Sequence, residues 1–568
     1  MDSLYGMFHG LISYAMPMII LLGLLIFVHE LGHFLVAKYY KVRVEVFSLG
    51  FGPKLFKFKR GDTVYAISAI PLGGYVKMFG DDPTSSVSHD QKQFAFNHKP
   101  VSQRIAIVLA GPLMNLFFAI VLFAGVAAIG EQALLAKLGD IKPDTPAYAA
   151  GFRSGDTIVS INSNPVKSWD ELQKAIEKNA DRTLNIVVQR EDSDSQETLQ
   201  VTPKLARNKN VLSWDREVGE IDGLTPSSRA SMIAVRSADT IAGQAGLQSG
   251  DVVRSVNGKE ITRWREFIAA LEKSTDDVLS IEVERGILAE KPEATKVSIS
   301  LTVPAELRDK PAIEKLNGLG IESPELYLAA IEKESPAEKA GLQQGDRLLS
   351  IDGKPVESFE QVSATIRSYG ETHSNGDEQA PPLTLVILRD GKEMTLQVAP
   401  NLRERMSPEG REVRRFEIGI RPMILEAPPA IFVITYSNPI AALERGVVQA
   451  WRWTSLTVLS FVRLFQAEVS AKNIGGFISI GQMAKTSWQV GLTQFLTVMA
   501  IISINLFILN LLPVPVLDGG HLVFYTIEAL RGAPLSMRKM EIAQQVGLFL
   551  LLALMVFALF NDVTRLFN

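Results

Sequence analysis

The sequence contains no cysteine, which excludes disulfides, thiolate metal sites and a cysteine nucleophile. It has no excess of basic residues either, because 58 Lys and Arg face 62 Asp and Glu, for a formal net charge of -4. Without a basic surface, no nucleic acid partner is expected. Histidine is scarce, with seven residues in a chain of 568, so a histidine pair at metal-ligand spacing is informative.

Long apolar stretches are present, and they predict a membrane protein. Hydrophobic residues make up 47% of the chain and charged residues 21%, which favours a chain partly inside and partly outside a bilayer. Four stretches are long enough to cross, at about 12–39, 101–130, 493–516 and 542–560. The first has no basic residue before it, so we expect it to remain as a helix and not to be removed as a signal peptide.

Lysine and arginine predict the orientation of these spans. They gather between residues 41 and 99, whereas residues 1–11 contain none. The positive-inside rule then places 41–99 in the cytoplasm, and both termini and residues 131–492 outside, which in a bacterium is the periplasm. A stretch at 439–465 is apolar but interrupted by charges, so we expect an amphipathic helix at the membrane surface.

A turn motif recurs three times in the outer segment. GFRSGD begins at Gly151, GLQSGD at Gly246 and GLQQGD at Gly341, in equal steps along the chain. Each copy continues into a short apolar strand, a turn and a helical pattern that opens on an aromatic residue. We expect capping boxes at Ser168 and Ser358, but none in the second copy, where arginine holds the cap position.

This order of elements resembles the bacterial PDZ domain and predicts a tandem of three PDZ-like domains. Such domains bind an extended peptide, often a C-terminus, as an added strand beside a helix. The alternative is that the copies are spacers or steric shields that bind nothing. The residues leave this choice open.

The segment His29-Glu30-Leu31-Gly32-His33 lies inside the first apolar stretch. Histidines four residues apart share one face of a helix and can bind one ion, while Glu30 beside them can act as a general base. Burying an ionisable side chain at membrane depth costs free energy, so such a residue is first interpreted as functional. Two buried histidines with a stray glutamate are the much weaker alternative, so the pattern predicts a zinc site.

Two histidines leave a catalytic zinc site one protein ligand short. Asp518 is the best candidate for the third ligand, because it ends a segment, LLPVPVLDGG, in which prolines and glycines break the third apolar stretch. Such a break frees backbone groups that must line a buried or wet cavity. An ordinary helix cap at the membrane interface is the alternative for Asp518.

The two motifs together carry a family resemblance. HExxH in an early span and N-x-x-P-x-P-x-L-D-G-G-H in a late span resemble the site-2 protease family of intramembrane metalloproteases, most closely its bacterial sigma-E regulator branch. The segments SLGFGP, IPLGGYVK and GPLMN also match, so the resemblance covers nearly the whole chain.

This resemblance implies roles for particular residues. His29, His33 and Asp518 are expected to bind Zn²⁺. Glu30 is expected to be the general base, and Asn510 to hold the substrate or the oxyanion.

Two features depart from the family. Members of this branch usually have two PDZ domains, whereas the turn motif occurs three times here, so the role of the added copy is open. A Gly-Pro pair common before the third span appears here as Gly476-Phe477.

The hairpin before the second span is the expected substrate contact. Residues 63–78 read as two short apolar strands around the Pro71–Gly74 turn, and in the family this region is a membrane-dipping β-hairpin that holds the substrate extended near the zinc. Gly73, Gly74 and Tyr75 are therefore expected at the substrate or the oxyanion. A plain cytoplasmic hairpin is the alternative.

The predicted architecture is a polytopic α-helical membrane protein with four spans, an inserted tandem of PDZ-like α+β domains and a short membrane-associated β-hairpin. The expected parts are a first span (1–39), a cytoplasmic loop with the hairpin (40–100), a second span (101–130), three PDZ-like domains (131–210, 216–304 and 318–402), a linker with the amphipathic helix (403–492), a third span with the LDGG motif (493–520) and a fourth span (542–561).

The resemblance implies regulated intramembrane proteolysis in the bacterial inner membrane. The expected substrate is a single-span membrane protein, an anti-sigma factor already trimmed on its outer side in an envelope stress response. The outer domains would admit only trimmed substrates. Further expected partners are the lipid bilayer and peptide C-termini at the PDZ-like domains.

Two other classes of function remain as alternatives. A catalytically inactive PDZ scaffold would not need the four site residues. A metal transporter also places His and Asp in spans, but it rarely needs a glutamate between two histidines or a large peptide-binding insert.

Overall fold

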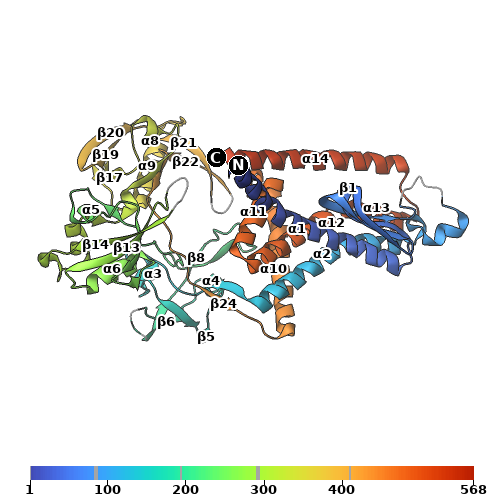
Figure 1. Ribbon diagram of the computed structural model, residues 1–568, viewed down its shortest axis with the longest axis horizontal. Coiled ribbons are helices and arrows are strands. Elements are labelled where there is room, and N and C mark those ends of the chain that lie inside the picture. Colours follow the sequence, from blue (N-terminus) through green and yellow to red (C-terminus); the bar gives the residue numbers. More distant parts are fainter. Residues whose placement is uncertain are drawn as a thin grey trace. The chain divides into compact units, whose positions relative to one another are not determined.

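The computed structural model describes residues 2–81, 87–191, 193, 195–288, 294–407 and 411–567. The chain divides into two compact units, shown in Figure 1. One unit comprises Met1–Gln132, Lys209–Trp214 and Val433–Asn568, and we call it the membrane unit. The other comprises Ala133–Asn208 and Asp215–Phe432, and we call it the outer unit. Strands β3 (Glu131–Leu134) and β24 (Ile431–Ile434) lie where the chain passes between the units.

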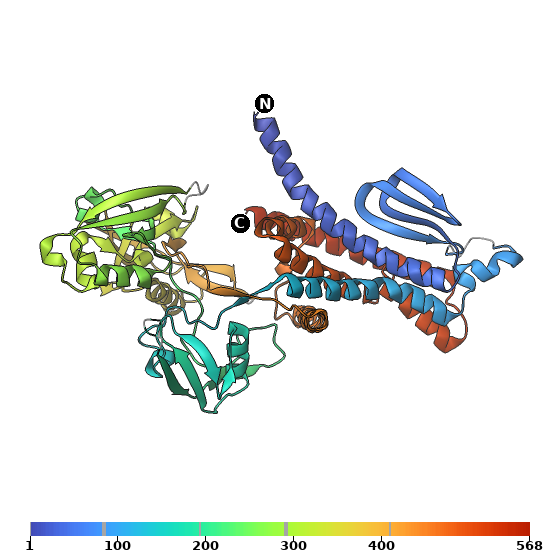
Figure 2. The same cartoon turned by 60° about the horizontal axis from the view of Figure 1, so that its bottom comes forward.

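The membrane unit consists mainly of helices, which Figure 2 shows from a second side. Among the described residues, four helices are long and apolar enough to cross a membrane, within 14–39, 101–129, 492–511 and 537–565, in line with the four expected spans. The elements of this unit are α1 (Asp2–Tyr39), β1 (Val44–Arg60), β2 (Thr63–Met78), η1 (His89–Phe94), η2 (Phe96–His98), α2 (Val101–Ile129), α10 (Pro439–Phe465), η5 (Ala471–Asn473), α11 (Phe477–Val490), α12 (Leu492–Leu511), α13 (Asp518–Arg531) and α14 (Met537–Phe567).

Close packing of α1, α2 and α12 forms the core of this unit. Leu21 and Leu25 of α1 are fully buried in one cluster with apolar side chains of α2 and α12. Gly32 lets α1 and α2 approach, because a Cβ there would lie 2.3 Å from the Ala110 carbonyl oxygen. Helix α10 packs on α2 and α12 and is not one of the four candidate spans, while its place at the membrane surface stays a prediction.

After α12 the chain forms a non-helical loop that contains Pro513 and Pro515. The sequence predicted a third span reaching residue 520, whereas α12 ends at Leu511 and α13 begins at Asp518. Gly519 and Gly520 allow α13 to fold back on this loop, because their Cβ atoms would lie 2.2 Å from the Leu512 oxygen and 2.4 Å from the Val514 oxygen. Asp518 is thus presented at the first turn of a helix that starts inside the unit.

The hairpin of β1 and β2 folds into a sheet of four segments. Residues 46–49 pair with 64–67 on one side and with 74–77 on the other, while residues 54–60 pair with 63–68. The segment order is therefore 74–78, 44–49, 63–68 and 54–60, which the expected pair of short strands did not anticipate. Gly50 and Gly52 have φ of 90° and 85° at the corner where β1 changes partner, a region that favours glycine.

The outer unit contains three copies of one α+β fold (Figure 1). Each has a four-stranded sheet, ordered β5-β4-β6-β7, β12-β11-β13-β14 and β18-β17-β19-β20. The first copy has α3 (Pro146–Ala149), β4 (Thr157–Ile161), β5 (Asn164–Pro165), α4 (Trp169–Glu177), β6 (Leu184–Gln189), β7 (Gln196–Val201), β8 (Lys204–Arg207) and β9 (Glu217–Glu220). The second has β10 (Ala234–Val235), α5 (Ile241–Gln244), β11 (Val252–Val256), β12 (Lys259–Glu260), α6 (Trp264–Lys273), β13 (Val278–Arg285), β14 (Thr295–Thr302), η3 (Ala305–Leu307), α7 (Ala312–Leu319) and β15 (Ile321–Glu322). The third has η4 (Pro324–Leu326), β16 (Leu328–Ile331), α8 (Pro336–Lys339), β17 (Arg347–Ile351), β18 (Lys354–Pro355), α9 (Phe359–His373), β19 (Leu383–Arg389), β20 (Lys392–Val398), β21 (Asn401–Met406), β22 (Glu412–Glu417) and β23 (Ile420–Pro422).

A buried ion pair explains the aspartate of the repeated GD turn. In the second copy Asp251 is 1% exposed and pairs with Arg285 at 2.8 Å, and Arg285 also donates to the Gly246 carbonyl. Asp156–Arg190 and Asp346–Arg389 repeat the pair at 2.6 and 2.7 Å. A buried carboxylate needs such a partner, and the ion pair links each turn to the end of the second long strand of its own sheet.

Each copy ends later than the sequence predicted. Ile221 and Leu224 belong to the core of the first copy, Ile321 to that of the second, and Ile418 and Ile420 to that of the third. The expected ends at 210, 304 and 402 miss this last segment, because its partners lie far back in each copy.

The predicted helix caps are mostly confirmed. Ser168 forms a full capping box with Glu171, and the Ser358 hydroxyl accepts from the Gln361 amide at 3.2 Å. The expectation that the second copy has no box is wrong in part, since Glu266 accepts from the Arg263 amide at 3.1 Å. The hydrogen bond from the cap residue's amide to the glutamate three residues later does not depend on which residue occupies the cap.

Candidate metal centre

The membrane unit brings His29, His33 and Asp518 together. Nε2 of His29 lies 3.1 Å from Oδ2 of Asp518, and Nε2 of His33 lies 3.6 Å from the same oxygen. The two Nε2 atoms are 3.2 Å apart. Among the described residues this is the only group of three His, Asp or Glu side chains with ligand atoms in reach of one ion.

These separations fit a tetrahedral zinc ion. Nitrogen and oxygen ligands at about 2.0–2.1 Å from zinc are about 3.3 Å from one another. The three observed separations of 3.1, 3.2 and 3.6 Å bracket that value. Three protein ligands also leave the fourth position open, which is the pattern of catalytic and not of structural zinc sites.

Neighbours of the two imidazoles set which ring nitrogen faces the centre. Nδ1 of His33 donates to the Ile107 carbonyl at 2.9 Å, so its Nε2 carries a free lone pair toward Asp518. Nδ1 of His29 lies 3.4 Å from the Asn115 amide nitrogen, while Oδ1 of Asn115 is buried without a partner. Turning that amide over would let Oδ1 accept from Nδ1–H of His29 and leave its Nε2 free for a metal.

Gly111 of α2 provides the room for the two rings. A Cβ at this position would lie 2.3 Å from Nε2 of His33 and 2.9 Å from Cε1 of His29. Real Cβ atoms do not approach so closely, so α2 can pack against this face of α1 only with glycine here. The imidazoles thus sit in a space that a side chain would fill.

Glu30 faces the innermost edge of the sheet. Its carboxylate lies close to the Val76 amide, and its Cγ would be 3.3 Å from a Cβ on Gly74. Segment 74–77 is paired with β1 on one side only among the described residues. A free strand edge therefore runs past the glutamate beside the two histidines.

The remaining predicted site residues take different positions. Gly73 and Gly74 are buried, and the Phe51 ring covers Gly73 so closely that a Cβ would meet it at 1.8 Å. Tyr75 stacks on the same ring, with centroids 6.2 Å apart. Asn510 is half-buried near the end of α12, and its side chain makes no hydrogen bond to the described residues.

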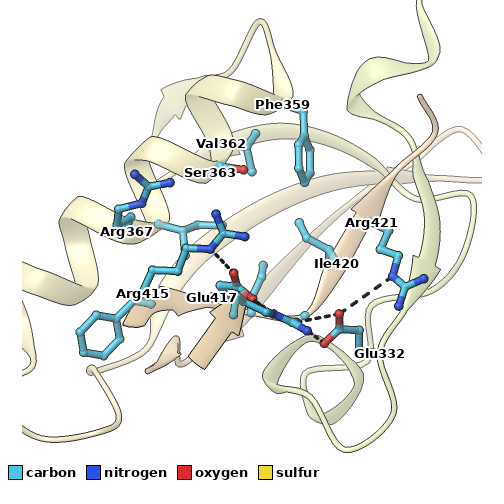
Figure 3. Close-up of a pocket in the computed structure, with 14 residues that line it drawn as sticks. Glu332, Phe359, Val362, Ser363, Arg367, Arg415, Glu417, Ile420 and Arg421 are labelled. Carbon is cyan, nitrogen blue, oxygen red and sulfur yellow. Dashed lines mark hydrogen bonds and ion pairs between the residues drawn. The ribbon is translucent and has the colours of Figure 1, made fainter. Parts of the chain in front are cut away.

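A second candidate site is a groove in the third copy of the outer unit. It has a volume of about 250 Å³ and lies between α9 and residues 415–421. Figure 3 shows Phe359 and Val362 of the helix opposite Ile420 of the strand, with Arg421 and Glu332 at one end. An apolar slot between a helix and a strand is the shape that accepts an extended peptide.

The rim of this groove carries more cations than anions. Its charged residues are Arg367, Arg405, Arg415, Arg421, Glu332 and Glu417. Glu332 pairs with Arg405 at 2.7 Å and Arg421 at 4.0 Å, and Glu417 pairs with Arg405 at 2.8 Å and with Arg415. Arg367 has no acidic partner among the described residues, so the rim is net basic.

The equivalent spaces in the other copies are filled by the chain itself. In the first copy β9 lies directly on α4, because a Cβ at Gly219 would be 2.4 Å from the Ile176 oxygen. In the second, α7 packs on both α6 and β15, and Nζ of Lys315 in α7 donates to the Leu271 carbonyl of α6 at 2.8 Å.

Sequence reasoning missed two features of these sites. It quoted GPLMN only as a family match, although Gly111 and Asn115 from this segment touch the histidines. It also missed a second repeated signal, a glycine with positive φ at 223, 320 and 419, each packed on the residue that caps the first short helix of its copy. Searching for repeats beyond the GD turn would have found it.

Comparison with known proteins gives matches over nearly the whole chain. The family described as Peptidase family M50 matches residues 17–554. A Neisseria meningitidis protein named as a zinc metalloprotease is 33% identical over 98% of this chain and 99% of its own length. The regulator of sigma-E protease RseP is 31% identical in Salmonella typhimurium and 29% identical in Escherichia coli, each covering 96% of this chain and 98% of the relative. A solved PDZ domain protein from Parabacteroides distasonis covers 54% of the chain at 11% identity, with a TM-score of 0.13 that carries no argument.

Proposed function

Because this chain belongs to Peptidase family M50, the site-2 protease family, and is therefore a metalloprotease, we propose that it cuts single-span membrane proteins within the bilayer at a zinc centre. The observation that carries the proposal is the meeting of His29, His33 and Asp518 on the membrane unit, with Glu30 beside them. A bacterial inner membrane location follows from the four apolar helices and the relatives. We place the outer unit and both termini in the periplasm on the positive-inside rule.

The first step is to hold the substrate in an extended form. A transmembrane helix buries its peptide groups in its own hydrogen bonds, so it must unwind before a bond can be attacked. The free edge of segment 74–77 offers backbone partners to an added strand. Gly74 leaves space between that strand and Glu30, so the scissile bond would pass in front of the carboxylate.

The second step is proton transfer by Glu30. Bound at His29, His33 and Asp518, Zn²⁺ would lower the pKa of an attacking water to about 7 and polarise the scissile carbonyl. Glu30 takes the proton from that water and delivers it to the leaving nitrogen, and the Val76 amide lies close to the carboxylate. Asn510 is assigned to support the substrate or the oxyanion, as the family resemblance implies.

The substrate is proposed to be an anti-sigma factor whose outer part has been removed by another protease. Relatives of this chain are named as regulators of sigma-E, which supports this substrate class. The outer unit would exclude a substrate that still carries a bulky outer domain. Its third copy would also bind peptide C-termini, because its groove is open, apolar at the floor and basic at the rim.

Glu30→Gln in the full-length protein tests the proposed chemistry. The variant keeps the size of the side chain, so metal content should be unchanged while cleavage of a tagged single-span substrate in membranes is lost. Both quantities are measured on the same preparation. Unchanged cleavage would exclude the mechanism, whereas a parent protein that cleaves no substrate would leave a PDZ scaffold as the alternative.

A further inference from the structure

The strand farthest from the metal centre has a composition that proteolysis does not explain. Residues 54–60 read Lys-Leu-Phe-Lys-Phe-Lys-Arg and form the outer edge of the four-segment sheet. All seven are exposed, including Phe56 at 74% and Phe58 at 63%. Exposed phenylalanines alternating with lysines are unusual for a face that meets only water.

Strand pairing sorts these side chains onto two faces. Residues opposite each other in a sheet share a face, and Phe58 pairs with Tyr65, on which its ring stacks at 5.1 Å. Lys54, Lys57 and Lys59 pair with Ser68, Ala66 and Val64, whose side chains point the other way from Tyr65. The strand therefore has an aromatic face and a lysine face.

The aromatic face is the one turned toward the first membrane helix. Tyr65 lies 6.0 Å from the ring of Phe34 in α1, and Phe47 lies 5.1 Å from the same ring. Phe34 belongs to the part of α1 that can cross a membrane. Phe56 and Phe58 continue this face past the helix, where the neighbour of a membrane helix is lipid.

The unpaired backbone of this edge limits how deep it can lie. One side of segment 54–60 pairs with 63–68, and the other has no strand partner among the described residues. Such an edge is not tolerated in hydrocarbon, where its amide and carbonyl groups would have no partner. The strand thus belongs at the level of the headgroups, with aromatic rings below it and lysines above.

Charge selects the kind of headgroup. Segment 54–60 has four cations and no acid, and the two acids of the hairpin are already engaged, Glu45 by Lys77 at 2.9 Å and Asp62 by Arg43 at 3.8 Å. We propose that this strand docks on anionic phospholipid headgroups, with Phe56 and Phe58 among the upper acyl carbons. The lipid then fixes one edge of the sheet whose opposite edge passes Glu30.

This inference depends on the helices lying in a membrane, but not on proteolysis. Its test therefore reads position and lipid dependence, not activity, so its failure is distinct from failure of the proposed peptidase. The absence of cysteine allows single spin labels to be placed without a background.

The first measurement is depth. Nitroxide labels on F58C and K59C in the full-length protein, reconstituted in nanodiscs, report collisions with oxygen and with a water-soluble nickel complex. We expect the label at 58 to meet mainly oxygen and the label at 59 mainly nickel. Equal nickel accessibility at both positions would overturn the membrane contact.

The second measurement is headgroup preference. The oxygen-to-nickel ratio at F58C is compared in phosphatidylcholine alone and with added phosphatidylglycerol. We expect a severalfold rise with phosphatidylglycerol that high salt reverses and that K54Q/K57Q/K59Q abolishes. The control K333Q/K339Q/K354Q removes the same charge from exposed lysines of the outer unit and should keep the rise. A rise that is absent in the parent, or that survives in K54Q/K57Q/K59Q, would overturn the preference for anionic lipid.

Discussion

At the scale of single residues, the metal centre depends on Gly111, because this position has no side chain to crowd the two imidazoles. Gly111→Ala would place a Cβ 2.3 Å from Nε2 of His33, so the ring must move or α2 must shift. We expect zinc affinity to fall about 10–100-fold, as for other disturbances of a ligand's surroundings, and cleavage to fall with it. Metal content after dialysis against a graded chelator measures the loss.

Gly125 of the same helix supplies the control for that substitution. A Cβ there would meet nothing within 4 Å, so Gly125→Ala should bind zinc and cleave substrate like the parent. Equal zinc affinity in Gly111→Ala and Gly125→Ala would show that the space around His33 tolerates a methyl group and would contradict the prediction.

The sequence could predict the parts of the metal centre that depend on local spacing. It could not predict the parts that depend on contacts between different helices. His29 and His33 share one helix face by spacing alone, with Glu30 beside them, and Asp518 stands out as a carboxylate in an apolar, proline-broken segment. Gly111 and Asn115 approach the histidines only because α2 packs against α1 at Gly32. No spacing rule within one segment encodes a contact between two helices.

At the scale of elements, the structure accounts for the departure at Gly476-Phe477. Asp562 of α14 accepts from the amides of Gly476, Ile478 and Ser479 at 3.0, 2.9 and 3.2 Å, and so caps the start of α11. The Phe477 amide is not among these donors. Proline, which is common at the first position of a helix, and phenylalanine are therefore both compatible with the cap.

The outer repeat was predictable as a repeat but not in its boundaries. GD turns, caps and aromatic-led helices are local signals, and they predict three copies in the right order. The closing segment of each copy pairs with residues far back in the chain. The arginines that pair with the buried aspartates lie at the end of a strand more than thirty residues downstream, for example Arg190 with Asp156. Both depend on tertiary pairing.

The groove of the third copy predicts a binding preference. Peptides with a free C-terminus and acidic side chains should bind the full-length protein more tightly than their amidated or basic counterparts, because the rim is basic. Arg367→Glu should weaken binding about tenfold or more, since a hydrogen bond to a charged group contributes about 1.5–3 kcal/mol. Fluorescence anisotropy of a labelled peptide measures the change.

Two further variants make that prediction specific to the groove. Ser363→Trp fills the groove from α9 and should abolish binding, while Arg182→Glu, an exposed arginine of the first copy, should leave it unchanged. Binding that survives Ser363→Trp would place the peptide elsewhere, and would favour a purely steric role for the third copy.

At the scale of the whole molecule, an ion-pair cluster couples the first and second copies of the outer unit. Glu191 of the first copy accepts from Nε and Nη2 of Arg265 in α6 at 2.9 and 3.1 Å, and pairs with Lys137 at 2.8 Å. Partial burial would raise the pKa of Glu191, but the hydrogen bonds from Arg265 and Lys137 prevail and lower it to about 2. The two copies are thus held together by a carboxylate that stays charged.

This depressed pKa predicts a pH dependence. A carboxyl group with a folded-state pKa of about 2 against 4.5 contributes stability above pH 4.5 that is lost as the pH falls toward 2. After allowance for solvent screening we expect Glu191→Gln to lower the free energy of unfolding by about 1–2 kcal/mol at pH 7, and by progressively less below pH 4.5. Hydrogen exchange of α6 in the full-length protein measures this difference.

The matched control for that variant is Glu360→Gln. Glu360 pairs with Lys142 between the third and first copies, but both side chains are mostly exposed, so its loss should change stability by no more than about 1 kcal/mol. If Glu191→Gln lowers the free energy of unfolding by the same amount at pH 7 and at pH 3, the cluster does not act through the charge of Glu191.

The proposed exclusion of bulky substrates is assigned to the outer unit as a whole. The same single-span substrate, fused to outer domains of increasing size, is presented to the full-length protein and to a variant in which a short linker replaces residues 133–432. We expect the full-length protein to cleave only the shortest substrates and the deletion variant to cleave all of them. The deletion also removes residue 211, whose carbonyl binds the buried Arg463 of α10 at 3.0 Å within the membrane unit. Arg463→Gln in the full-length protein isolates the loss of that contact and should keep the size limit. A deletion variant that still rejects the larger substrates would rule out steric exclusion by the outer unit.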